Sequence, residues 1–233
     1  MCPSGPTTPR AASGSELPSW SRVLVVVAHP DDETFGLGAV IDLLTRTGAE
    51  VRVLCYTRGE ASTLNEIGAS LHSVREGELR EAGAVLGVAG VDLLDYGDGR
   101  LAAIPEAELA AQVLQALTSH RADGLLVFDE TGITGHPDHR AATKAAVRAA
   151  SSRGLPVLAW ALPRMVADQL RAETGQPFAG QPPDRLDMSL PVDRGAQRRA
   201  AAEHASQVAP TSVLWRRLEL LGDHEHLRWL SRP

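Results

Sequence analysis

The sequence predicts an α/β protein with one mostly parallel sheet flanked by helices. From Arg22 onward, short β-branched runs alternate with longer stretches whose apolar residues recur at helical spacing, as in successive βαβ units. The first run, RVLVVVA, is apolar throughout, as expected of a strand buried on both faces of such a sheet. The 233 residues, 43% of them hydrophobic, are sufficient for a single domain with a sizeable core.

The elements follow in order from this alternation. Gly48 ends the first helix, and Pro105 suits the first turn of a later one, where its missing amide hydrogen is not needed. Pro191 places the last strand at an edge, because a central strand would lose a ladder hydrogen bond. The predicted strands are 22–28, 50–57, 91–96, 124–130, 155–163 and 187–193. The predicted helices are 34–47, 71–86, 105–118, 141–150 and 196–208. Residues 165–183 are rich in Gly, Gln and Pro and are predicted to form an irregular lid.

The composition excludes several classes of protein. A net charge of −6 and a pI near 5.7 offer no broad cationic surface for nucleic acid. No apolar run approaches the roughly 20 residues that a membrane span needs. Residues 1–20 are rich in Pro, Ser, Gly and Thr and are predicted to be a flexible leader, with the domain at 21–233. Cys2 and Cys55 do not indicate a disulfide framework. We expect a soluble, cytoplasmic protein without nucleic acid or a membrane as partner, and a homo-oligomer is possible.

Residues that can perform chemistry follow the first predicted strand. In a doubly wound sheet the ligand lies beyond the carboxyl ends of the strands, and this turn reads AHPDDET over residues 28–34. An imidazole and three carboxylates stand where a dinucleotide-binding protein has glycines, so the turn favours a cation over a phosphate. Acidic residues in a first helical turn are common for another reason, because they cap the helix and interact with its dipole. That interpretation accounts for the acids but leaves His29 unexplained.

A matching turn, TGHPDHR at residues 134–140, follows the fourth predicted strand. A lone His136 or His139 would more often be a surface or capping residue. If both turns lie at one edge of the sheet, however, His29, Asp32 and His139 can meet as a His₂Asp site. Three protein ligands with an open fourth position for water are typical of catalytic zinc. The two turns together therefore favour a metal site.

The motifs AHPDDE and GHPDH closely resemble those of the LmbE/PIG-L family of zinc-dependent N-acetylglucosaminyl deacetylases. The resemblance extends to TRGE at 57–60, to REGE at 75–78, to DGRL at 98–101 and to AEHASQ at 202–207, so that only the leader falls outside it. It implies a Rossmann-like fold and hydrolytic deacetylation of a small-molecule N-acetylglucosaminyl conjugate to the free amine and acetate, with one Zn²⁺ per subunit.

The resemblance also implies a role for each motif residue. It assigns zinc binding to His29, Asp32 and His139, and it makes Asp31 the general base. Zinc lowers the pKa of bound water toward about 7, and a neighbouring carboxylate can take the proton as the water attacks the amide carbon. His136 then stabilises the oxyanion, and a protonated imidazole could also deliver a proton to the departing amine.

Other positions carry weaker expectations. Asp138 is expected to orient or polarise a histidine from the side that faces away from the metal. Arg58, Arg75 and Asp98 are candidate ligands for sugar hydroxyls or an attached acidic group, although such residues near strand ends are more often partners in solvated ion pairs. Thr134 stands where some relatives have a tyrosine, so stabilisation of the oxyanion by a phenol is not expected.

Three alternatives stay open. The DHEH run at residues 223–226 is metal-like in composition, but histidines two apart do not share a helical face, and we interpret it as solvated surface. The enzyme could be an amidase of the same superfamily acting on a thiol or glycoside conjugate. A non-catalytic nucleotide- or metal-binding module is a third possibility, since the fold alone supports it. Asp31 favours hydrolysis, because a binding module needs no unligated carboxylate. Fe²⁺ or Co²⁺ could occupy the same ligands.

Overall fold

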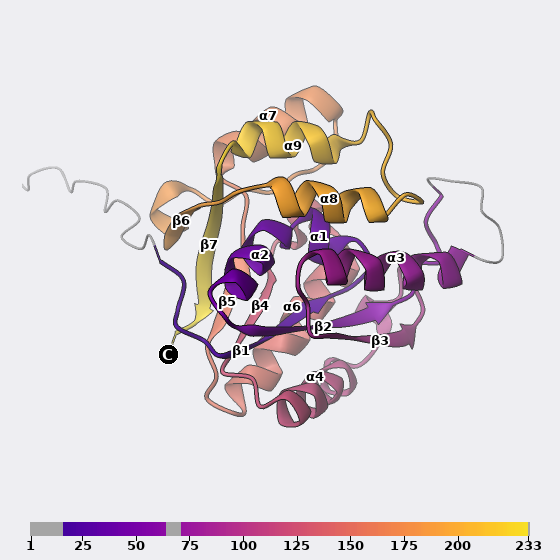
Figure 1. Cartoon of the computed structure of the whole chain (residues 1–233), viewed down its shortest axis with the longest axis vertical. Coiled ribbons are helices and arrows are strands. Elements are labelled where there is room, and N and C mark those ends of the chain that lie inside the picture. Colours follow the sequence, from indigo (N-terminus) through magenta and orange to yellow (C-terminus); the bar gives the residue numbers. More distant parts are fainter. Residues whose placement is uncertain (1–15, 64–70, 233) are drawn as a thin grey trace, which may run out of the picture.

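The computed structural model describes residues 16–63 and 71–232, and one seven-stranded sheet lies at its centre (Figure 1). The strand order is β3-β2-β1-β4-β5-β7-β6. The first five strands in this order pair in parallel, and β7 is antiparallel to both β5 and β6. The predicted mostly parallel α/β sheet is confirmed. The strands are β1 (Arg22–Val27), β2 (Glu50–Thr57), β3 (Gly90–Tyr96), β4 (Gly124–Phe128), β5 (Val157–Trp160), β6 (Met188–Pro191) and β7 (His224–Ser231).

Helices cover both faces of the sheet (Figure 1). Along β1, the side chains of Val23, Val25 and Val27 pack toward one face, and those of Leu24 and Val26 pack toward the other. The apolar run of β1 therefore follows from burial on two faces. The helices on the first face are α2 (Gly38–Arg46), α3 (Leu71–Val85) and α8 (Gly195–Glu203), and those on the second are α4 (Glu106–His120) and α6 (Pro137–Ser151).

The first predicted helix is two helices in the structure. The turn α1 (Asp32–Phe35) ends at Gly36, and α2 begins at Gly38. A Cβ atom at Gly36 would collide with the ring of Phe128, which ends β4. The glycine thus permits a close approach between the break in the helix and the end of β4.

The predicted lid at residues 165–183 is wrong, because most of it is α7 (Arg164–Thr174). Ala167 and Leu170 bury one side of this helix, and Gly175 ends it in a left-handed conformation with φ 71°. The segment that follows is tied to the core, since the amide of Ala179 donates to the carbonyl of Ile133 at 2.6 Å. Composition suggested irregular structure here, whereas the apolar spacing and the glycine cap were signals for a helix.

The C-terminal part contains a helix and a strand that the sequence analysis did not identify, α9 (Val213–Leu221) and β7. In the DHEH run, Glu225 is 0% exposed and accepts hydrogen bonds from Trp160 Nε1 at 2.6 Å and Arg194 Nη1 at 2.5 Å. The interpretation of this run as solvated surface is therefore wrong for Glu225. From His224 onward the run is the start of β7, whose alternate residues point inward, and not a helix.

Residues 1–15 of the predicted leader lie outside the described residues. Leu17 and Trp20, also within that prediction, pack against the core, and Trp20 meets Trp229 edge to face at a centroid distance of 5.9 Å. No helix in the described part of the chain is long and apolar enough to cross a membrane. The remaining short elements are α5 (Gly132–Gly135), η2 (Leu101–Ala103) and η3 (Pro183–Arg185).

Candidate active site

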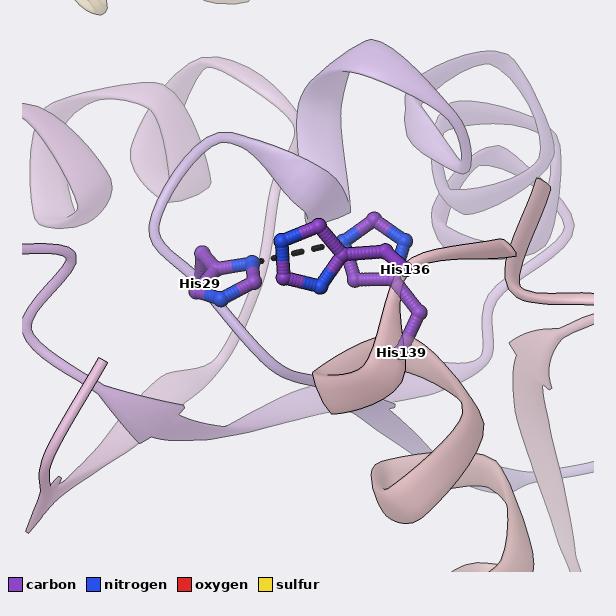
Figure 2. A group of neighbouring side chains, drawn as sticks. All are labelled: His29, His136 and His139. Carbon is purple, nitrogen blue, oxygen red and sulfur yellow. Dashed lines mark hydrogen bonds between the residues drawn. The ribbon is translucent and has the colours of Figure 1, made fainter. Parts of the chain in front are cut away.

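The two histidine-containing turns meet at the carboxyl ends of β1 and β4, which are neighbours in the sheet. His29 comes from the turn after β1, and His136 and His139 come from the start of α6. Figure 2 shows the three imidazole rings gathered together, with a dashed line joining His29 and His139. The sheet thus brings together residues more than 100 positions apart in the chain.

Three predicted ligands have side-chain atoms at ligand spacing. Nε2 of His139 lies 3.3 Å from Nδ1 of His29 and 3.1 Å from Oδ1 of Asp32. Nδ1 of His29 is 3.5 Å from the same carboxylate at Oδ2. Tetrahedral zinc with bonds of about 2.0–2.1 Å separates its ligand atoms by about 3.3 Å. The donor set and its spacing therefore fit a zinc ion.

In both predicted ligand histidines, the ring nitrogen that faces away from the cluster has an acceptor. Nε2 of His29 lies 3.0 Å from Asp98 Oδ1 and 3.3 Å from Asp138 Oδ2, and Nδ1 of His139 lies 3.2 Å from the carbonyl of Gly132. These contacts favour the tautomers that leave His29 Nδ1 and His139 Nε2 free for a metal. Burial opposes a charge on His29, but the carboxylates outweigh it and raise the pKa of His29 well above its ordinary value.

Asp31 lies beside the ligands but faces a different partner. Its Oδ2 accepts from Arg75 Nη2 at 3.0 Å, and its backbone amide donates to Glu33 Oε2 at 3.0 Å. Its backbone φ angle of 109° is one that residues other than glycine rarely adopt. Burial raises the pKa of Asp31 to about 6, against the opposing attraction of Arg75. A carboxylate with this pKa is suited to accept a proton near neutral pH.

His136 caps α6. Its Nδ1 accepts from the amide of Asp138 at 3.2 Å, so its ring proton lies on Nε2. The ring stacks on His139 with centroids 4.7 Å apart, and its nitrogens lie within 4.8 Å of ligand atoms of both other histidines. Ligation through Nε2 would move the proton onto Nδ1, against the Asp138 amide. Burial and the charge on His139 lower the pKa of His136, which disfavours the protonated form that the sequence analysis invoked. A neutral ring still donates from Nε2.

The three candidate substrate ligands each have interaction partners within the protein. Arg75 is 3% exposed and donates to Gly59 O, Pro30 O and Asp31, so it supports the general-base candidate from behind. Arg58 pairs with Glu76 at 2.6 Å and with Asp95 at 2.7 Å. Asp98 contacts His29 and accepts from the amide of Ala61 at 3.0 Å. Contact of any of the three with substrate stays a prediction.

Two buried networks around the turns were not predicted. Glu33 Oε1 accepts from His204 Nε2 at 2.7 Å, and both residues are 0% exposed. Asp129, at the end of β4, accepts from the amide of Thr131, from Gln181 Nε2 and from Arg228 Nη1 at 2.9–3.1 Å. His204 stands in the AEHASQ motif, which was a signal for it, whereas Arg228 lies on the strand that the sequence analysis missed.

Comparisons with known proteins agree with this geometry. The model of one protein family, described as PIG-L: GlcNAc-PI de-N-acetylase, matches residues 24–150. A probable N-acetylglucosaminyl-phosphatidylinositol de-N-acetylase of Schizosaccharomyces pombe is 31% identical over 148 residues, covering 61% of this chain and 57% of that protein. A 1D-myo-inositol 2-acetamido-2-deoxy-alpha-D-glucopyranoside deacetylase of Nakamurella multipartita is 30% identical over 241 residues, covering 81% of this chain and 80% of that protein.

The fold is shared with a solved structure as well. An N,N'-diacetylchitobiose deacetylase from Pyrococcus horikoshii superposes with a TM-score of 0.65 and 24% identity, covering 91% of this chain and 84% of that one. The relatives and this neighbour are thus named as deacetylases of N-acetylglucosamine-type compounds.

Proposed function

The chain belongs to the PIG-L family, and on that premise we propose that it is a zinc-dependent hydrolase that removes the acetyl group from an N-acetylglucosaminyl conjugate. The observation that carries this proposal is the Asp31 carboxylate, which lies beside the cluster of His29, Asp32 and His139 and is held by Arg75. A site that only stored metal or bound a nucleotide would need no such base. The products are the free amine and acetate.

The residues of the site have different roles in the proposed reaction. His29, Asp32 and His139 would hold a Zn²⁺ ion, which would supply Lewis-acid polarisation of the amide carbonyl. Asp31 takes the proton of the attacking water, because its carboxylate is not committed to the ligand cluster and its pKa lies near 6. Arg75 keeps that carboxylate in place through the 3.0 Å contact.

His136 is the second donor for the oxyanion. With Nδ1 accepting from the α6 backbone, Nε2–H is the group that it can present to developing negative charge. A preorganised donor of this kind typically contributes about 10²–10³-fold in kcat. No phenol is needed at the position of Thr134.

The test is Asp31→Asn, with zinc content and acetate release measured on the same preparation. We expect stoichiometric zinc to be retained and kcat on N,N'-diacetylchitobiose or a related glycoside to fall by about 10²-fold or more, the scale of a positioned general base. Asp168→Asn, an exposed acid on α7, is the matched control and keeps full activity. Near-normal turnover in Asp31→Asn would remove this residue from the base role, and absence of amide hydrolysis by the wild type on every amino-sugar conjugate tried would overturn the proposal.

A further inference from the structure

A cavity of about 370 Å³ adjoins the second histidine turn, between α6 on one side and η2 and the start of α4 on the other. Its lining combines apolar side chains with the charged side chains of Glu106, Arg140 and Lys144. Leu101 and Leu109 are at most 1% exposed, and Ile104 and Ala141 are half-buried. Such a mixed lining suits an organic group that has both an apolar body and a charged end.

Two cations line the same cavity from α6. Arg140 and Lys144 are one helical turn apart and exposed, so their charges repel each other. Within residues 16–63 and 71–232, neither side chain has an ion-pair or hydrogen-bond partner. The acidic lining residue, Glu106, is paired with Arg148 at 3.4 Å. The cavity therefore combines an apolar wall with uncompensated positive charge.

The cavity borders the candidate active site. Gly135 and Pro137 line it and flank His136 in the chain. The amide of Leu101, in its wall, donates to Asp138 Oδ1 at 3.0 Å, and the other oxygen of that carboxylate lies 3.3 Å from His29 Nε2. A molecule whose amide is at the metal ligands could extend along this turn into the cavity.

We propose that this cavity is a subsite for the part of the conjugate beyond the amino sugar, and that it takes an apolar group carrying a negative charge. The proposal rests on the proposed function for the identity of the occupant, but binding of such a group can be measured without turnover. The apolar body contacts the accessible part of the wall, formed by Ile104, Pro137 and Ala141, and the anion is bound by Arg140 and Lys144 at the mouth.

Lys144 makes the test specific, because it is the only lysine in the sequence. Reductive ¹³C-methylation keeps its positive charge and leaves one side-chain amine signal besides that of the chain terminus. Titration with hexyl phosphate and with hexanoate is expected to shift the Lys144 signal saturably, and the two probes tell a phosphate from a carboxylate site. Hexanol and inorganic phosphate are expected to give no saturable shift at the same concentrations.

Two variants distinguish binding in the cavity from nonspecific attraction of the anion to the positive charges of the protein. Arg140→Gln is expected to weaken binding of hexyl phosphate by about tenfold, the loss of one charge-assisted contact, whereas Arg153→Gln, just beyond the same helix, leaves it unchanged. A Lys144 signal that does not move with either organic anion, or that moves equally with inorganic phosphate, overturns the proposal.

Kinetics then link the subsite to the substrate. In the double variant Arg140→Gln/Lys144→Gln, kcat/KM for an N-acetylglucosaminide with an anionic alkyl aglycone is expected to fall about 10²-fold, about tenfold for each contact, mainly through KM, while that for N,N'-diacetylchitobiose is unchanged. Equal loss on both substrates refutes a subsite role. If the wild type binds the alkyl anion yet hydrolyses no amide, the proposed function fails while the cavity remains an anion site.

Discussion

The turn at residues 28–34 and the turn at residues 134–140 look alike in sequence but are held in different ways. In the first turn, Asp32, Glu33 and Thr34 are all buried, and their polar atoms are used by neighbouring backbone and side chains. In the second turn, His136 is half-buried and Arg140 is exposed, and a helix cap supplies the main restraint on His136. Asp138 of the second turn is also buried and accepts from the amides of Gly99 and Leu101. The two turns therefore differ at the candidate catalytic residue, because Asp31 is held from several sides whereas His136 is held mainly by the helix cap.

The first turn contains strain that its neighbours offset. Asp31 has φ 109°, a conformation that costs about 1–3 kcal/mol for a residue other than glycine. Glu33 accepts the Asp31 amide with one carboxylate oxygen and His204 with the other, and Arg75 holds the Asp31 carboxylate. Residues remote in sequence thereby hold the carboxylate of the candidate base in place beside the predicted metal ligands.

The largest expected effect concerns the metal, to which each turn is predicted to contribute a histidine ligand. His139→Ala should abolish stoichiometric zinc binding, because it removes one of three protein ligands, and His29→Ala should do the same. Metal analysis of the purified variants checks this. His120→Ala, whose ring pairs with Asp92 at 2.7 Å away from the site, should keep its zinc. Full zinc occupancy in His139→Ala would show that the ligands are assigned wrongly.

The second turn can be tested by separating its two roles. His136→Ala and His136→Asn should both lower kcat by roughly 10²-fold with zinc retained, since neither keeps the Nε2 donor. Asparagine is a good helix cap, so only the alanine variant should also lose about 1 kcal/mol of unfolding free energy. Denaturant unfolding measures this difference. Loss of zinc in both variants would make His136 a ligand instead.

The first turn should respond to a change that touches neither metal nor substrate. Glu33→Gln replaces one acceptor oxygen by a donor group, so one of its hydrogen bonds is lost and Asp31 shifts. We expect kcat to fall about tenfold or more with KM and zinc content unchanged, the effect of a small misplacement. Glu78→Gln is the matched buried control, because Glu78 binds Ser206 and not this turn. Equal losses in both variants would indicate a general folding defect.

The smallest expected effects are on how the free energy of unfolding depends on pH. The contribution of His204, which binds the first turn through Glu33, should decrease as pH rises, and that of His136 in the second turn should decrease as pH falls. Burial opposes a charge on His204, but Glu33 outweighs it and raises the pKa above 6.5. The stability that His204 contributes is therefore present below pH 6.5 and is lost as pH rises through the raised pKa. The pKa of His136 is lowered from 6.5, so its contribution is present above pH 6.5 and declines as pH falls.

Urea unfolding of the metal-free protein from about pH 5.5 to 8.5 checks this contrast. The stability gap between wild type and His204→Asn should narrow as pH rises, whereas the gap between wild type and His136→Ala should narrow as pH falls. Parallel trends in the two variants would contradict the different anchoring of the two turns.

The sequence alone determined the alternation of strands and helices and the positions of both chemical turns. Runs such as 22–28 and 50–57 are apolar because a parallel sheet buries both faces, and local periodicity reports that directly. The carboxyl ends of parallel strands share one edge, so His29 and His139 could be paired before any coordinates were known. Where composition was weighed above periodicity, as in the segment that forms α7, the prediction failed.

Only the tertiary structure decided how the site is held. The contact of His204 with Glu33 spans 171 positions, and that of Arg228 with Asp129 spans 99. No local pattern encodes such pairs, because each depends on how helices and the antiparallel strand β7 pack against the sheet. The burial of Glu225, the ring tautomers favoured at His29 and His136 and the cation-lined cavity beside α6 have the same origin. They follow from which atoms surround a group in space, and spacing along the chain does not carry that information.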